Sequence, residues 1–172
     1  MKKIGRICLI LLLGLTSLGS VVHAEDFSVS AEHAMAIDVT SGKILFEQDA
    51  ETPVAVGSIT TLLTAYLVYE AIEEGALSLD TQVSIGDYPY SLTGTVVSNV
   101  SLEARSYTVQ DLLSAMLITS ANSPAIALAE KIAGSEPAFV DMMKAQLTEW
   151  GISDAKLVNA TGLKNSYLGE QR

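Results

Sequence analysis

The sequence is poor in the residues that hold metal ions and form disulfides. Its 172 residues include one cysteine and two histidines. A single cysteine cannot form a disulfide within the chain, and these three side chains are too few for a four-ligand Cys/His zinc cage. We therefore expect neither a metal nor a cofactor.

Basic residues are also scarce. The chain has 10 Lys and Arg against 20 Asp and Glu, which gives a net charge of −10. So acidic a surface argues against a nucleic-acid partner held through its phosphates. Apolar residues nevertheless make up 49% of the chain and charged residues 17%, which excludes a disordered acidic tail. The length favours one domain.

Residues 1–24 have the pattern of an export signal. Lys2, Lys3 and Arg6 precede an apolar run over 7–15, and the segment ends at Ala24 in a small-residue cleavage pattern. The run is short for a membrane-spanning helix, which needs about 20 apolar residues. We expect cleavage before Glu25, which removes three basic residues and no acidic one and takes the charge to −13. The mature chain, 25–172, would then be extracytoplasmic.

The first part of the mature chain predicts a hairpin and a helix. Residues 34–39 and 43–48 are strand-like, and the turn Thr40-Ser41-Gly42 joins them. Residues 59–74 read as a helix with apolar positions on most sides, which is typical of a buried helix.

The remainder predicts a mainly helical region. We expect a strand near 82–85 and a loop over 91–101. Helices follow over 108–118, 123–133 and 135–150, and a strand over 155–159. The first of these helices opens with a capping box that begins at Thr108.

Ser58 stands where the buried helix starts. One interpretation is a helix cap, in which the hydroxyl accepts a bond from a free backbone N–H. The other is a nucleophile, because the N–H groups of a helix start stabilise nearby negative charge. A nucleophilic serine needs a base, and the position one helical turn later holds Thr61, which cannot be one near neutral pH. The residues alone favour the cap.

A second polar motif, Ser120-Ala121-Asn122, lies between two predicted helices. Its side chains could simply cap helix ends. Alternatively, Ser120 would relay a proton in a cleft and Asn122 would hold a substrate amide. Ser-x-Asn by itself is a weak signal.

Taken together, these motifs and their flanks resemble the serine D-alanyl-D-alanine carboxypeptidases, which are low-molecular-weight penicillin-binding proteins. The resemblance spans about residues 33–169 and is carried by residues 37–45, 53–60, 62–64, 119–130 and 159–163. The family's Ser-x-Asn motif is matched by Ser120-Ala121-Asn122.

The resemblance implies an α+β fold of the β-lactamase and DD-peptidase type, with an antiparallel sheet beside an all-helical region and the site between them. Ser58 would attack the penultimate D-Ala carbonyl of a peptidoglycan stem peptide, and water would free the acyl-enzyme. Ser120 and Asn122 would form the second motif. β-Lactams would acylate the same serine.

The sequence departs from the family pattern in two ways. The family's Ser-x-x-Lys reads Ser58-Ile59-Thr60-Thr61, so Thr61 occupies the position of the lysine base. The 172 residues also lack the family's Lys-Thr-Gly motif, its C-terminal sheet strands and its C-terminal membrane attachment. We therefore expect the mature chain to be the N-terminal portion of the catalytic domain. It should be less stable than a complete family member and have weak or no activity.

Two other functions stay open. A class A-type β-lactamase shares the two-motif layout, but Ala121, the Gly162-Leu163 pair and the lack of a later Glu-x-x-x-Asn favour the carboxypeptidase. The other is a non-catalytic protein that binds the cell wall or a partner. Penicillin labelling at Ser58 would distinguish an enzyme-like site from such a module.

Overall fold

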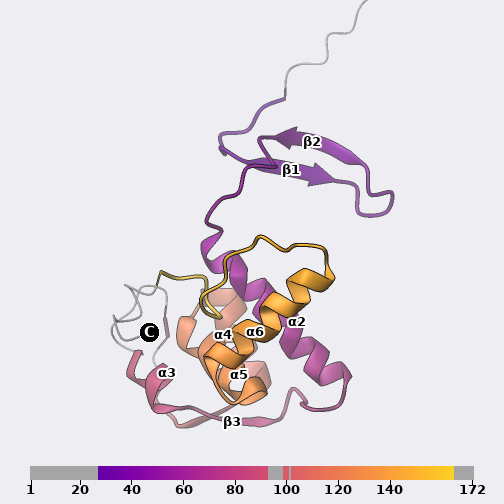
Figure 1. Ribbon diagram of the computed structural model, residues 1–172. Coiled ribbons are helices and arrows are strands. Elements are labelled where there is room, and N and C mark those ends of the chain that lie inside the picture. The colour runs from indigo at the N-terminus through magenta and orange to yellow at the C-terminus, as the bar shows by residue number, and fades with distance from the viewer. Residues whose placement is uncertain (1–26, 93–98, 101, 165–172) are drawn as a thin grey trace, which may run out of the picture. The chain divides into compact units, whose positions relative to one another are not determined.

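The computed structural model describes residues 27–92, 99–100 and 102–164 (Figure 1). The expected signal segment, 1–24, and much of the expected loop 91–101 lie outside these residues. The chain divides into two units at Val54/Ala55, called here the hairpin unit and the helical unit. No helix in the described part of the chain is long and apolar enough to cross a membrane.

The hairpin unit contains the predicted pair of strands. β1 (Ala34–Ile37) pairs with the antiparallel β2 (Ile44–Gln48), with Ala36 opposite Phe46. The Asp38 carboxylate accepts from the backbone N–H of Ser41 at 2.7 Å and from its hydroxyl at 2.8 Å. These two bonds hold the pKa of Asp38 below its ordinary value, and the bond from the backbone N–H has the larger effect. The expected hairpin is therefore confirmed.

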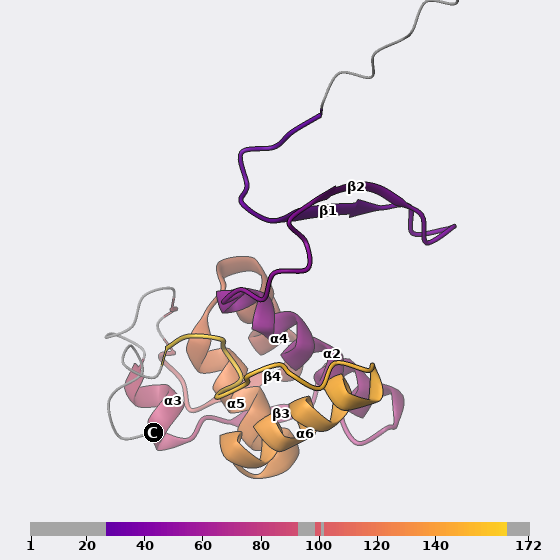
Figure 2. The same cartoon turned by 45° about the horizontal axis from the view of Figure 1, so that its top comes forward.

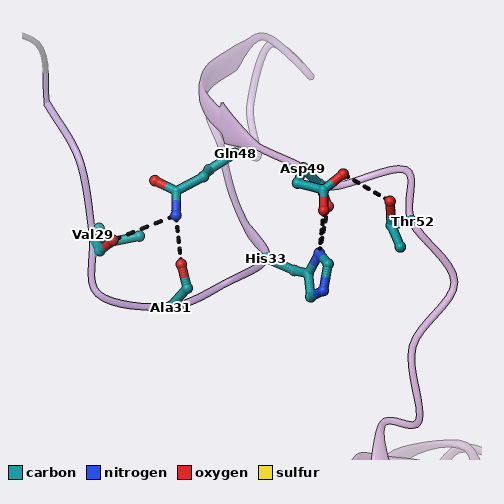
Figure 3. Close-up of polar contacts among 6 residues, drawn as sticks. All are labelled: Val29, Ala31, His33, Gln48, Asp49 and Thr52. Atoms are coloured by element: carbon teal, nitrogen blue, oxygen red, sulfur yellow. Dashed lines mark hydrogen bonds and ion pairs between the residues drawn. The ribbon is translucent and has the colours of Figure 1, made fainter.

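Polar side chains tie the segment before β1 to the end of β2 (Figure 3). The Gln48 amide donates to the carbonyl of Ala31, and Nδ1 of His33 lies 2.8 Å from the carbonyl oxygen of Asp49. Asp49 has a left-handed backbone, φ 43°, and its carboxylate accepts from the Thr52 hydroxyl at 2.7 Å. These bonds fix both chain ends of the hairpin locally.

The helical unit begins with a 3-10 turn and gathers four longer helices side by side (Figures 1 and 2). Its elements are η1 (Gly57–Ile59), α2 (Thr60–Glu73), β3 (Gln82–Ser84), α3 (Asp87–Ser91), β4 (Ser106–Thr108), α4 (Val109–Thr119), α5 (Asn122–Ala133) and α6 (Glu136–Glu149). β3 and β4 form a small antiparallel pair. The predicted helices are confirmed, and Thr108 and Asp111 make the expected capping box.

The core of this unit has two main clusters. In the first, α2, α4 and α5 share Val68, Leu112, Met116 and Leu128. In the second, Leu67 of α2 packs with residues of α6 and with Ala160. α5 contacts α2, α3, α4 and α6, and residues 121–129 are all buried. Its alanines let neighbouring helices approach closely. The helices that carry the two motifs therefore belong to one packed body.

Two sequence-based expectations need correction, and two short elements were not predicted. Residues 155–159 form no strand but enter a buried turn, because Asn159 bonds its own following backbone. β4 and α3 were not predicted, since each is only a few residues long. α2 is not buried on most sides. Its Leu63 and Leu67 enter the core, but it exposes one stripe, formed by Leu62, Tyr66 and Tyr69 and continued by Ile59 of η1.

Candidate active site

Ser58 lies in η1, directly before α2, and is exposed. Gly57 before it has a φ of 57°, which glycine adopts without strain. Neither η1 nor α2 has a side-chain cap, so the helix-cap interpretation of Ser58 is wrong. Its hydroxyl makes no hydrogen bond within the described residues. Ser58 therefore presents an uncommitted hydroxyl at a helix N-terminus, where backbone N–H groups favour negative charge.

Thr61 lies one turn after Ser58, as the spacing predicts, but its hydroxyl is committed elsewhere. The side chain is buried, at 6% exposure, and its Oγ1 donates to the backbone carbonyl of Ser58 at 2.7 Å. A threonine hydroxyl bonded back along its own helix cannot take a proton from Ser58 near neutral pH. The position that would hold the base therefore holds a local structural bond.

The second motif occupies the junction between α4 and α5. Ser120 ends α4 in the left-handed conformation, φ 57° and ψ 35°, and its hydroxyl has no hydrogen bond within the described residues. A non-glycine residue in this conformation costs about 1–2 kcal/mol. Asn122 is the first residue of α5 and is only 2% exposed. The N-cap position of α5 is occupied by Ala121, which makes no side-chain cap bond, so neither polar residue of the motif stands at that position.

Asn99 holds the start of α5 and was missed from the sequence. Its amide nitrogen donates to the hydroxyl of Ser123 at 2.7 Å and to the carbonyl of Leu92 at 3.1 Å. Its amide oxygen accepts from the backbone N–H of Ser123 at 3.2 Å. Asn99 thereby fixes the residue that follows the Ser120–Asn122 motif. No sequence signal separates it from the other polar residues of its loop.

A buried turn at Asn159–Gly162, here the 159–162 turn, lies against the start of α2. The Asn159 side-chain oxygen accepts from the backbone N–H of Gly162 at 2.8 Å. The carbonyl of Ala160 accepts from the Thr64 hydroxyl of α2 at 2.7 Å. The Asn-Ala-Thr-Gly sequence is a turn signal that could have located this element.

Within the part of the chain that the structure describes, no group of three or more His, Cys, Asp or Glu side chains could hold a metal ion. The candidate residues Ser58, Ser120 and Asn122 offer two hydroxyls and one amide. A hydroxyl can serve as a nucleophile when a base takes its proton.

Comparison with known proteins agrees with this chemistry. Residues 20–168 match the model of the family described as Peptidase_S11, D-alanyl-D-alanine carboxypeptidase. The D-alanyl-D-alanine carboxypeptidase DacF of Bacillus subtilis is 30% identical over 140 residues, which is 81% of this chain and 35% of the relative.

Solved structures show the same likeness. A crystal structure of a peptidoglycan synthesis regulatory factor (PBP3) from Streptococcus pneumoniae matches with a TM-score of 0.81 and 59% identity. The match covers 84% of this chain and 40% of that one. Penicillin-binding protein D2 from Listeria monocytogenes, in its ampicillin-bound form, matches at TM-score 0.68 and 32% identity, over 82% of this chain and 55% of that one. The expected β-lactamase and DD-peptidase fold, present in part, is thereby confirmed.

The chain spans well under half the length of the Bacillus relative and of the pneumococcal structure. The family match, in contrast, covers most of the chain itself, including both motifs. The chain therefore belongs to the D-alanyl-D-alanine carboxypeptidase family.

Proposed function

We propose that this chain carries the acylation site of a serine-type D-alanyl-D-alanine carboxypeptidase, with Ser58 as nucleophile. The observation that carries the proposal is the exposed, uncommitted hydroxyl of Ser58 at the N-terminus of α2. Family membership supplies the substrate class, a peptidoglycan stem peptide that ends in D-Ala-D-Ala.

The reaction has two steps. Ser58 Oγ forms a bond to the penultimate D-Ala carbonyl carbon, the C–N bond to the terminal D-Ala breaks, and the hydroxyl proton ends on the departing amine. Water then hydrolyses the ester and restores the hydroxyl. α2 begins just after Ser58, and the positive end of its dipole would favour negative charge on the attacked carbonyl oxygen. Ser120 relays the proton and Asn122 holds a substrate amide.

Thr61 leaves Ser58 without the family's lysine base. General-base catalysis typically contributes about 10²–10⁴-fold, and the hydroxyl at this position is bonded to the Ser58 carbonyl. β-Lactams would acylate Ser58 as they do other penicillin-binding proteins. The ampicillin-bound relative supports this expectation.

Release of D-Ala from a diacetylated stem peptide tests the proposal. We compare the chain, its Thr61→Lys variant, and a Thr61→Lys protein extended by the carboxyl-terminal part of the pneumococcal relative, where the family resemblance leads us to expect the Lys-Thr-Gly strand. We expect turnover only from the extended protein, and Ser58→Ala should abolish it. Equal turnover by the short and extended Thr61→Lys proteins would show that the added strand is dispensable. No turnover by the extended protein would contradict the proposal.

We also propose that the protein acts outside the cytoplasm after removal of residues 1–24. The charged start, the short apolar run and Ala24 support export, and the family's substrate class lies in the cell wall. Mass spectrometry of the exported protein should find Glu25 at its N-terminus. An exported protein that retains Lys2 and Lys3 would contradict cleavage.

A further inference from the structure

The 159–162 turn is buried in a way that loops seldom are. Asn159 is 3% exposed, and Ala160 and Thr161 are fully buried. A buried loop must satisfy its own backbone polar groups. Here the Asn159 side chain accepts from the N–H groups of Thr161 and Gly162, and its amide nitrogen donates to the carbonyl of Leu163 at 2.8 Å. The turn is therefore a rigid element rather than a loose connection.

The turn packs so closely against the residue before Ser58 that there is no room for a side chain at Gly162. Gly162 has a φ of 74°, and a Cβ atom there would overlap the carbonyl oxygen of Gly57 and lie 2.5 Å from Oγ1 of Thr60. Only glycine fits both the conformation and the space. A side chain at position 162 would therefore have to displace the carbonyl of Gly57, which belongs to the 3-10 turn that carries Ser58.

Two further bonds fix the turn in place. The Thr64 hydroxyl donates to the carbonyl of Ala160 at 2.7 Å, and the Glu136 carboxylate accepts from the N–H of Ala160 at 3.1 Å. Thr60 and Thr64 are four residues apart and so lie on one face of α2. The turn thus contacts η1 and the first turns of α2 while anchored to the start of α6.

We propose that the 159–162 turn is a positioning element for Ser58, and that Gly162 and Thr64 are its positioning residues. The turn fixes η1 so that the Ser58 side chain stays within the field of the N–H groups at the start of α2. The inference rests on the proposed role of Ser58 as nucleophile. It assigns no chemical step to the turn.

A thiol at position 58 reports this placement without any substrate. In a Ser58→Cys, Cys8→Ser protein the introduced thiol is the only one in the chain. Thiols at helix N-termini have pKa values well below the ordinary value of about 8.5. We would measure the rate of alkylation by iodoacetamide between pH 5 and 10. We expect Gly162→Ala to raise the thiol pKa by about one unit, which lowers the rate at pH 7 by up to about tenfold.

Gly151→Ala is the matched control. Gly151 also has a left-handed φ, 82°, but a Cβ atom there meets nothing within 4 Å. It should leave the pH profile of the thiol unchanged. An unchanged profile in folded Gly162→Ala protein, or an equal shift in both variants, would overturn the proposal.

A milder pair covers the case in which Gly162→Ala does not fold. Thr64→Val removes the hydroxyl that bonds Ala160, whereas Thr64→Ser retains it. We expect the valine variant to raise the thiol pKa and to lower the alkylation rate at pH 7 by about threefold. The serine variant should have the same profile as the protein with Thr64. Identical profiles would overturn the inference. If instead D-Ala release fails while the thiol profile responds, only the proposed function is contradicted.

Discussion

The helical unit and the hairpin unit bury their apolar side chains to very different extents. Phe139 of α6 is fully buried, and α5 contributes an unbroken run of buried residues. In the hairpin unit, Phe27, Met35, Ile37, Val39, Ile44 and Leu45 are all exposed by 49% or more. The helical unit therefore carries its own core, whereas the hairpin depends on its turn and on side-chain bonds to backbone. The candidate site residues Ser58, Ser120 and Asn122 all lie in the unit with the core.

Amide hydrogen exchange should show the largest contrast between the units. Two-stranded hairpins are marginally stable in water, whereas core helices exchange only on global unfolding. We expect amides of α5 to be protected about 10³-fold more than those of β1 and β2. Exchange followed by mass spectrometry measures both in one sample. Equal protection would contradict the comparison.

Truncating one phenylalanine in each unit sharpens the contrast. Phe139→Ala removes a fully buried ring and should cost about 3–5 kcal/mol of the free energy of unfolding. Phe46 is half-buried and contacts Phe27 edge to face, with ring centroids 4.9 Å apart, so Phe46→Ala should cost about 0.5–1.5 kcal/mol. Urea denaturation monitored by circular dichroism gives both values. The comparison is wrong if Phe46→Ala costs as much as Phe139→Ala.

Ser120 tests whether strain is stored at the site. Glycine accepts the left-handed conformation of residue 120 and alanine does not, so Ser120→Gly should be about 1 kcal/mol more stable than Ser120→Ala. Both lose the hydroxyl and should reduce D-Ala release by the extended Thr61→Lys protein equally. A glycine variant that keeps full turnover would remove Ser120 from the proton relay.

The smallest expected effect is at the tip of the hairpin. The pKa of Asp38 lies below its ordinary value of 3.8, so its contribution to stability is present above that pH and is lost as the pH falls through the lowered pKa. Ser41→Ala removes one of the two Ser41 donors and keeps the stronger, backbone one. We expect the pKa of Asp38 to rise part of the way toward 3.8, as followed by NMR of the carboxyl carbon.

Thr40→Ala is the control for this titration, since only the backbone of Thr40 contributes to the lowered pKa. In the Thr40→Ala variant, the pKa of Asp38 should equal that in the parent protein. A full return to the ordinary value in Ser41→Ala would mean that the backbone bond contributes nothing.

The sequence predicts the helices of this molecule better than their surroundings. The Thr108–Asp111 capping box marks the start of α4, and Gly134 marks the end of α5. Both could be predicted because cap chemistry is local. The exposed stripe of α2 could not be foreseen, since apolar composition does not say which face is covered. Asn99 and the 159–162 turn act through contacts with residues distant in the chain, which no local pattern records.

Among the candidate residues, the position of Ser58 at the start of α2 and that of Thr61 one turn later follow from helix spacing. The cap interpretation failed because the N-cap residues of η1 and α2 are Val56 and Ile59, not Ser58. The left-handed backbone of Ser120 was not predictable, since serine rarely adopts it.

Mapping of a penicillin adduct tests the central claim most directly. Benzylpenicillin is incubated with the extended Thr61→Lys protein and with its Ser58→Ala variant, and the modified peptide is identified by mass spectrometry. We predict one covalent adduct per protein, located on Ser58, and none on the Ser58→Ala variant. An adduct on another residue, or one that persists in Ser58→Ala, would contradict the assignment of Ser58 as the acylated serine.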